Sequence, residues 1–258
     1  MPTKKIPEVI SSDSPSVTVP KSWDELSPKD FRYLCGLFAS RLTAGQFDSL
    51  LFLHLAGIRV VGHSDDGMPL IRIGKRLYFI NPEVGGVACE SIQWSHEIAP
   101  LSAVSRLMPT VHKSAIDPRL NDMSFGRYIE LDNLYTGYLT TEKDLLAISM
   151  AKRLWPRMKR VTPRCQAAAV ICFSSIKNDL IQQYRDLFSD SANNESDIFG
   201  HTKNSPAALR ESVNAQIRAL TKGDVTLEEK VLAAPVHRAL TELNQLAKEY
   251  AEFKSKFN

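Results

Sequence analysis

Residues 124–155 read SFGRYIELDNLYTGYLTTEKDLLAISMAKRLW. Apolar side chains recur here every three or four residues, first over 125–138 and again over 145–154, as they do on one face of an α-helix. Thr141 with Asp144 has the pattern of an N-cap between the two halves. The stretch therefore predicts a helical hairpin, and its aromatic stripe, Phe125, Tyr128, Tyr135 and Tyr138, is expected to pack in the core.

Two shorter helices are predicted nearer the start of the chain. Ser27 followed by Pro28 supplies an N-cap hydroxyl and a proline at the first helical position. Thr43 with Gln46 has the spacing of a capping box, and the apolar run behind it closes at Gly57. An antiparallel pair of helices is therefore expected before residue 58.

The pattern changes to strands between residues 58 and 80. The apolar runs 70–73 and 77–80 flank a turn that begins with Gly74. A glycine at the first position of a short turn is typical of a β-hairpin. We expect a small antiparallel element here.

The last third of the chain predicts further helices over 166–188, over 206–221 and after Pro235. Thr226 with Glu229 has capping-box spacing ahead of the last of these helices. Its apolar residues trace a narrow, heptad-like seam, which is typical of a bundle helix or a partner-binding helix. The seam residues taken as candidate partner contacts are Leu240, Leu243 and Tyr250.

These patterns predict a mainly α (α+β) protein: a helical bundle with a small β-hairpin or antiparallel sheet near residues 58–80. Composition divides the chain into a flexible N-terminal arm at 1–20, a helical hairpin plus β-hairpin region at 21–122, and a helical domain at 123–258. A polar loop is expected at 189–205 within the last of these.

The chain of 258 residues is 43% hydrophobic and 24% charged, which is ordinary globular usage. Its net charge of +3 is far from the strongly basic balance of a dedicated nucleic-acid module. No apolar run is long enough for a signal-peptide core or a bilayer-crossing helix. We expect a protein of the cytoplasm without membrane partners.

Catalytic patterns are few. The sequence contains neither G-x-x-x-x-G-K-S/T nor a G-x-G-x-x-G turn, and its four cysteines lack metal-site spacing. We therefore predict no cofactor, no metal and no catalytic residue. The neighbours His96 and Glu97 suggest a general base, which leaves a small hydrolase as one alternative.

Charge is concentrated in one segment. Between Asp144 and Asp179 the chain has no acidic residue. The basic and aromatic residues that we take as candidate contacts are Lys152, Arg153, Trp155, Arg157, Lys159, Arg160 and Arg164. Such a segment serves as a solvated connector, as a contact for an acidic protein, or as a contact for nucleic-acid phosphates. The solvated connector requires no partner and is the first interpretation, and Trp155 among the arginines adds some support to the other two, since tryptophan and arginine are enriched at interface hot spots.

The stretch MSFGRYIELDNLYTGY at 123–138, followed by TEKDLLAISMAKRLWP at 141–156, resembles a pattern in uncharacterised phage and prophage proteins of Bacteroidetes. The opening SWDELSP at 22–28 is similar to the same group, as are Arg218 to Leu220 and the downstream helix around Leu240. Because such genes lie in tail modules, the resemblance implies a role in the virion or in tail assembly, such as that of a tail assembly chaperone.

The expected function is therefore that of a non-enzymatic, phage-derived interaction protein. Its expected partners are other phage tail proteins or a second copy of itself, in the host cytoplasm or in a virion. The main alternative is an accessory protein that binds nucleic acid through residues 152–164, and the other is the hydrolase built around His96 and Glu97.

Overall fold

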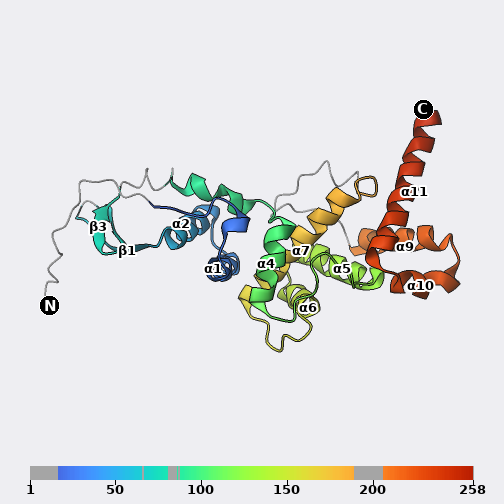
Figure 1. The fold of residues 1–258 in the computed structure, drawn as a ribbon, viewed down its shortest axis with the longest axis horizontal. Coiled ribbons are helices and arrows are strands. Elements are labelled where there is room, and N and C mark those ends of the chain that lie inside the picture. The colour runs from blue at the N-terminus through green and yellow to red at the C-terminus, as the bar shows by residue number, and fades with distance from the viewer. Residues whose placement is uncertain (1–16, 66, 81–85, 87, 189–205, 258) are drawn as a thin grey trace. The chain divides into compact units, whose positions relative to one another are not determined.

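The computed structural model describes residues 17–65, 67–80, 86, 88–188 and 206–257. It is mainly helical with one small antiparallel sheet, as the sequence predicts (Figure 1). Most of the predicted arm at 1–20 and all of the predicted polar loop at 189–205 lie outside the described residues.

The chain forms two compact units, residues 1–95 and 96–258. This boundary lies earlier than the predicted one at 122, because the helix α4 (Leu101–Val111) packs against α7 (Pro163–Gln183) of the second unit. None of the described helices is both long enough and apolar enough to cross a bilayer.

The first unit opens with η1 (Trp23–Glu25), α1 (Pro28–Phe38) and α2 (Ala44–Leu55). Both predicted caps are confirmed: the Ser27 hydroxyl accepts from the Asp30 amide, and the capping box of Thr43 and Gln46 is complete. These caps satisfy amides that have no partner inside the helix.

Tertiary contacts hold α1 and α2 together. His54 of α2 stacks on Tyr33 of α1 with ring centroids 3.7 Å apart, and its Nε2 lies 2.9 Å from Asp30 Oδ1. Trp23 packs edge-on against Trp94 of η2 (Glu90–His96), with ring centroids 5.4 Å apart. Ring stacking, a hydrogen bond and an edge-on aromatic contact therefore join the helical elements of this unit.

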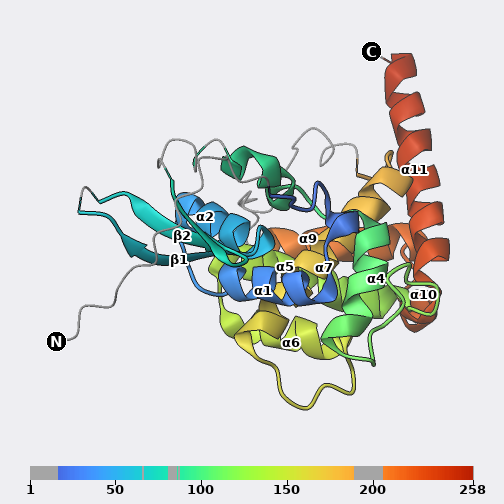
Figure 2. The same cartoon turned by 60° about the vertical axis from the view of Figure 1, so that its left-hand side comes forward.

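A three-stranded antiparallel sheet completes the first unit, in the order β1 (Ile58–His63), β2 (Pro69–Ile73), β3 (Arg76–Phe79). Figure 2 shows β1 and β2 running side by side next to α2. Gly74 has a φ of 58°, which the first position of its two-residue turn requires. The predicted hairpin is confirmed, and a third strand extends it.

The second unit is built around α7, whose residues 168–176 are all buried. Helices α5 (Phe125–Thr141) and α6 (Asp144–Leu154) form the predicted hairpin, and both views place α7 between α4 and α5 (Figures 1 and 2). Tyr135 packs against Phe173 with ring centroids 5.3 Å apart. The aromatic stripe is therefore core, as predicted.

The chain then forms α9 (Pro206–Thr221), η3 (Val225–Leu227), α10 (Glu228–Ala233) and α11 (Val236–Phe257). The start of α5 is bonded to the start of α11, since the Phe125 amide donates to the Ala234 carbonyl at 2.8 Å and the Val236 amide to the Met123 carbonyl at 3.0 Å. The last helix is thus fixed at its first turn.

Two predicted caps are wrong. Thr141 is the last residue of α5, and its hydroxyl donates to the Gly137 carbonyl rather than capping α6. Likewise, the residue that accepts from the Thr226 amide is Asp224, so Thr226 does not form a box with Glu229. Thr141 therefore ends α5 instead of capping α6, and Asp224 caps η3 ahead of α10.

Candidate functional site

The basic loop, defined as residues 152–164, runs from the last turn of α6 through the connection to the first turn of α7, and it is anchored to the body of the second unit (Figure 1). The Trp155 indole is fully buried, and its Nε1 donates to the Met108 carbonyl at 3.1 Å. The Arg157 amide donates to Ser114 Oγ at 3.1 Å, and the Thr162 hydroxyl caps α7. The backbone of the loop is therefore held in place, while five of its six cations are exposed.

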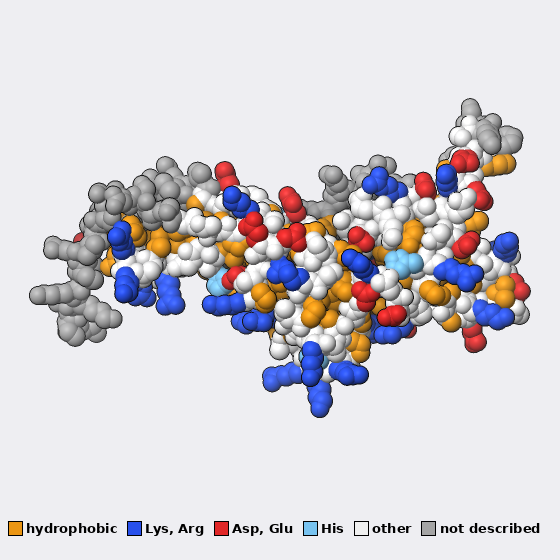
Figure 3. Space-filling model, viewed as in Figure 1, with side chains coloured by type: hydrophobic (Ala, Val, Ile, Leu, Met, Phe, Trp, Pro, Cys, Tyr) orange, Lys and Arg blue, Asp and Glu red, His pale blue; other side chains and the backbone are white. Residues whose placement is uncertain are grey.

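Five cations of the basic loop are exposed: Lys152, Arg157, Lys159, Arg160 and Arg164. Lys113 is also exposed and adjoins Ser114, the residue that bonds the loop. In the part of the chain that the structure describes, none of these six makes an ion pair. Figure 3 shows Lys and Arg side chains gathered at the lower edge of this unit.

Two residues predicted as contacts of the basic segment have internal roles instead. Arg153 is half-buried and pairs with Glu130 of α5 at 3.0 Å. Trp155, predicted at an interface, is a core residue with no exposed surface. The apolar face of α6 continues to Trp155, one residue past the end of the helix. The indole therefore packs in the core against α4 instead of facing a partner.

The predicted seam of α11 divides into a covered part and an exposed part. Leu240 and Leu243 are buried within the chain's own core, which corrects their prediction as partner contacts. The first half of α11 contacts α5 and α9, and the Asn244 Oδ1 accepts from the Leu187 amide at 3.0 Å. These residues therefore stabilise the unit itself.

Beyond Asn244, α11 carries three exposed apolar side chains. Leu246 is 40% exposed, Tyr250 70% and Phe253 62%. Their spacing of four and then three residues places them on one side of the helix. We name this set the α11 face; the sequence indicated Tyr250 but missed Leu246 and Phe253, although continuation of the seam could have found them. The final turns of α11 extend away from α9 and α10 (Figure 1).

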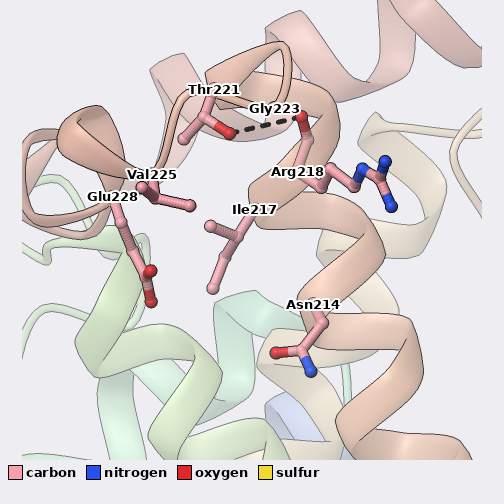
Figure 4. Close-up of a pocket in the computed structure, with 7 residues that line it drawn as sticks. All are labelled: Asn214, Ile217, Arg218, Thr221, Gly223, Val225 and Glu228. Carbon is pink, nitrogen blue, oxygen red and sulfur yellow. Dashed lines mark hydrogen bonds between the residues drawn. The ribbon is translucent and has the colours of Figure 1, made fainter.

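A cavity of about 340 Å³ lies between α9, η3 and α10. Figure 4 shows the apolar side chains of Ile217 and Val225 facing one another across it. Glu228 lies on the same side of the cavity as Val225. The Arg218 guanidinium extends away from them. Because its ionisable groups do not converge, this cavity does not have the arrangement of an acid–base site.

Neither His96 nor Glu97 is among the residues that line this cavity. His96 ends η2 and is half-buried, while Glu97 is exposed. Within the described ranges, no three His, Cys, Asp or Glu side chains come together as a metal site requires.

Burial perturbs several side chains of the second unit. It raises the pKa of the Tyr135 hydroxyl to about 12, with a further contribution from the nearby charge of Asp132. Lys177 reaches Asp132 at 2.6 Å and lies 5.7 Å from the centre of the Tyr135 ring. This cluster packs α5 against α7, and it has a structural role.

Comparison of the chain with models of known families, with curated proteins and with solved structures gives no match.

Proposed function

We propose that this chain is a non-enzymatic interaction protein that assembles with other proteins through the second half of α11. The observation that carries the proposal is the α11 face, where Leu246, Tyr250 and Phe253 expose 40–70% of their surface along one side of a single helix. Contiguous exposed apolar groups mark interaction sites. A helix that presents such groups at i, i+4 and i+7 fits a groove on a partner.

The resemblance of residues 123–156 to phage tail-module proteins supports a more specific role. In this proposal the chain is a tail assembly chaperone or a component of the particle, and its partner is another tail protein or a second copy of the chain. An exposed apolar face is what such an assembly role requires, because the face is covered only once the partner is present.

The test is co-expression with the products of the neighbouring genes, followed by size exclusion with light scattering. A double variant, Leu246→Glu with Tyr250→Glu, places charge on the α11 face and should abolish the complex. Leu145→Glu is the matched control, since Leu145 of α6 is 74% exposed and lies elsewhere on the same unit. A chain that stays monomeric with every neighbour, or a double variant that still assembles, would overturn the proposal.

The basic loop supports a second candidate function, that of an accessory protein that binds nucleic acid. Its exposed cations lie on an anchored backbone, so little ordering is needed when phosphates bind. The test is binding of a labelled duplex by Arg157→Gln/Arg160→Gln at several salt concentrations. Each phosphate contact contributes a slope of about 0.9 in log affinity against log salt, so the variant should lose about 1.8. No binding at low salt would contradict this candidate.

A further inference from the structure

The sheet of the first unit brings together cations that the sequence separates. Arg59 of β1 lies directly opposite Arg72 of β2 in the register of the strands, and both are exposed. Side chains of directly opposed residues project from the same face of a sheet, with Cβ atoms roughly 5 Å apart. The two arginine side chains therefore leave the same face of the sheet side by side.

Two further cations lie at the same end of the sheet. Lys75 occupies the second position of the β2–β3 turn, and Arg76 follows it opposite Ile73, which places Arg76 on the other face of the sheet from Arg59 and Arg72. We name Arg59, Arg72, Lys75 and Arg76 the arginine ribbon; all four are exposed. Among the described residues none of the four makes an ion pair, and Figure 3 shows Lys and Arg side chains gathered over the sheet at the left of the view.

This arrangement opposes stability. Like charges directly opposite one another in an antiparallel pair repel and destabilise the sheet. Because strand pairing fixes the backbones of Arg59 and Arg72, their Cβ atoms cannot separate without breaking the register. An anion placed over both side chains would turn this repulsion into attraction.

We propose that the arginine ribbon binds the phosphate backbone of duplex DNA. The end of the sheet is cationic on both faces, with Arg59 and Arg72 on one, Arg76 on the other and Lys75 in the turn, and it therefore favours a partner with many closely spaced anions. Duplex DNA has such a set of anions, because its phosphates place one negative charge per roughly 1.7 Å along the helix axis. An acidic protein would have to crowd several carboxylates into the same area against their mutual repulsion. Arginine also favours phosphate, since its planar fork donates two parallel hydrogen bonds.

All three strands reach this end of the sheet, where Ile58, Ile73 and Arg76 lie in one row beside the two-residue turn at Gly74 and Lys75. This inference concerns the first unit, and it does not rest on the function proposed for α11.

The test measures binding of the full chain to a labelled DNA duplex by fluorescence anisotropy across a salt series. The variant is Arg59→Gln/Arg72→Gln. Its matched control is Lys29→Gln/Arg32→Gln, which removes two exposed cations from α1 of the same unit. The ribbon variant should lower the salt slope by about 1.8 and reduce affinity roughly 10- to 100-fold at low salt, whereas the control should bind like the original chain.

Other outcomes separate the surfaces and the partners. If the ribbon variant binds like the control, or if only Arg157→Gln/Arg160→Gln reduces binding, the ribbon is not the DNA site. If polyglutamate displaces the duplex as well as unlabelled DNA of equal charge does, the partner is an acidic protein and the proposal is overturned. Thermal unfolding checks the fold: the ribbon variant should unfold at or above the temperature of the original chain, because removing the opposed charges relieves repulsion.

Discussion

The two cationic surfaces differ in how the chain builds them. In the basic loop the cations are close neighbours in the sequence and extend from a backbone that Trp155 fixes to the core. In the arginine ribbon they come from three strands, and the register of the sheet places Arg59 beside Arg72. A run of charge in a sequence thus reveals the first kind of surface and conceals the second.

The two surfaces also differ in what supports them. The loop is held by a fully buried indole, whereas β3 of the ribbon ends at Phe79, which is 37% exposed. A buried anchor is worth more to stability than a partly exposed one, since more apolar area leaves water. The two surfaces should therefore respond very differently to substitutions.

The largest effect is expected at the loop anchor. Trp155→Ala should lower the free energy of unfolding by about 3–5 kcal/mol, because it leaves a cavity and an unpaired Met108 carbonyl. Phe79→Ala should lower it by only about 1–2 kcal/mol, in proportion to the area that is buried. Urea unfolding followed by circular dichroism measures both. Equal losses would mean that the ribbon is packed as tightly as the loop.

The turn of the ribbon should show the next largest effect. Gly74→Ala should lower the free energy of unfolding by about 1–2 kcal/mol, because an L-residue is strained at a φ of 58°. Gly62→Ala is the control within the same sheet, since an added Cβ there meets no atom within 4 Å and its φ is not positive. Thermal unfolding of the two variants checks this, and similar losses would show that the turn is not limiting.

The opposed arginines should give a smaller effect of the opposite sign. Arg72→Thr should raise the free energy of unfolding by about 0.2–1 kcal/mol, because it removes a like-charge pair. Arg76→Thr makes the same change opposite the apolar Ile73 and should bring no such gain. The difference should shrink as salt screens the charges. An equal gain in both variants would come from strand propensity alone.

The smallest effect is expected at Asp117. This residue lies three positions after Ser114, whose hydroxyl oxygen accepts from the Arg157 amide of the basic loop. Burial raises the pKa of the Asp117 carboxyl, but hydrogen bonds from Arg119 and Asn121 outweigh it and keep that pKa below its ordinary 3.8. The charged form therefore stabilises the folded chain above pH 3.8, and this contribution is lost as the pH falls through the folded-state pKa. The melting temperature of Asp117→Asn should fall less below pH 4 than that of the original chain. Parallel curves would contradict this assignment.

Most of the fold could be predicted from the sequence, since its signals are local. The caps at Ser27 and Thr43 involve residues three positions apart, and the glycine turn at Gly74 requires a single backbone conformation. The misplaced caps at Thr141 and Thr226 show the limit of this reasoning. Several polar residues lie close to each helix end there, and the sequence does not say which one accepts the amide.

The candidate surfaces were predicted only in part. The basic loop was found because its cations lie close together in the sequence, yet Trp155 and Arg153 within it have internal roles. The seam of α11 was found by its spacing, but the pattern does not show where cover by α5 and α9 ends. Leu243 and Leu246 look alike in the sequence, and only the first is buried.

The sequence by itself determined where the helices and the hairpin lie, because helix caps, periodicity and turn conformation act over a few neighbouring residues. The tertiary structure decided which apolar residues face outward and which cations meet. Burial depends on elements distant in the chain, as when the Met108 carbonyl accepts a hydrogen bond from the indole N–H of the buried Trp155. Strand register, which places Arg59 opposite Arg72, likewise depends on pairing between segments that no local pattern relates.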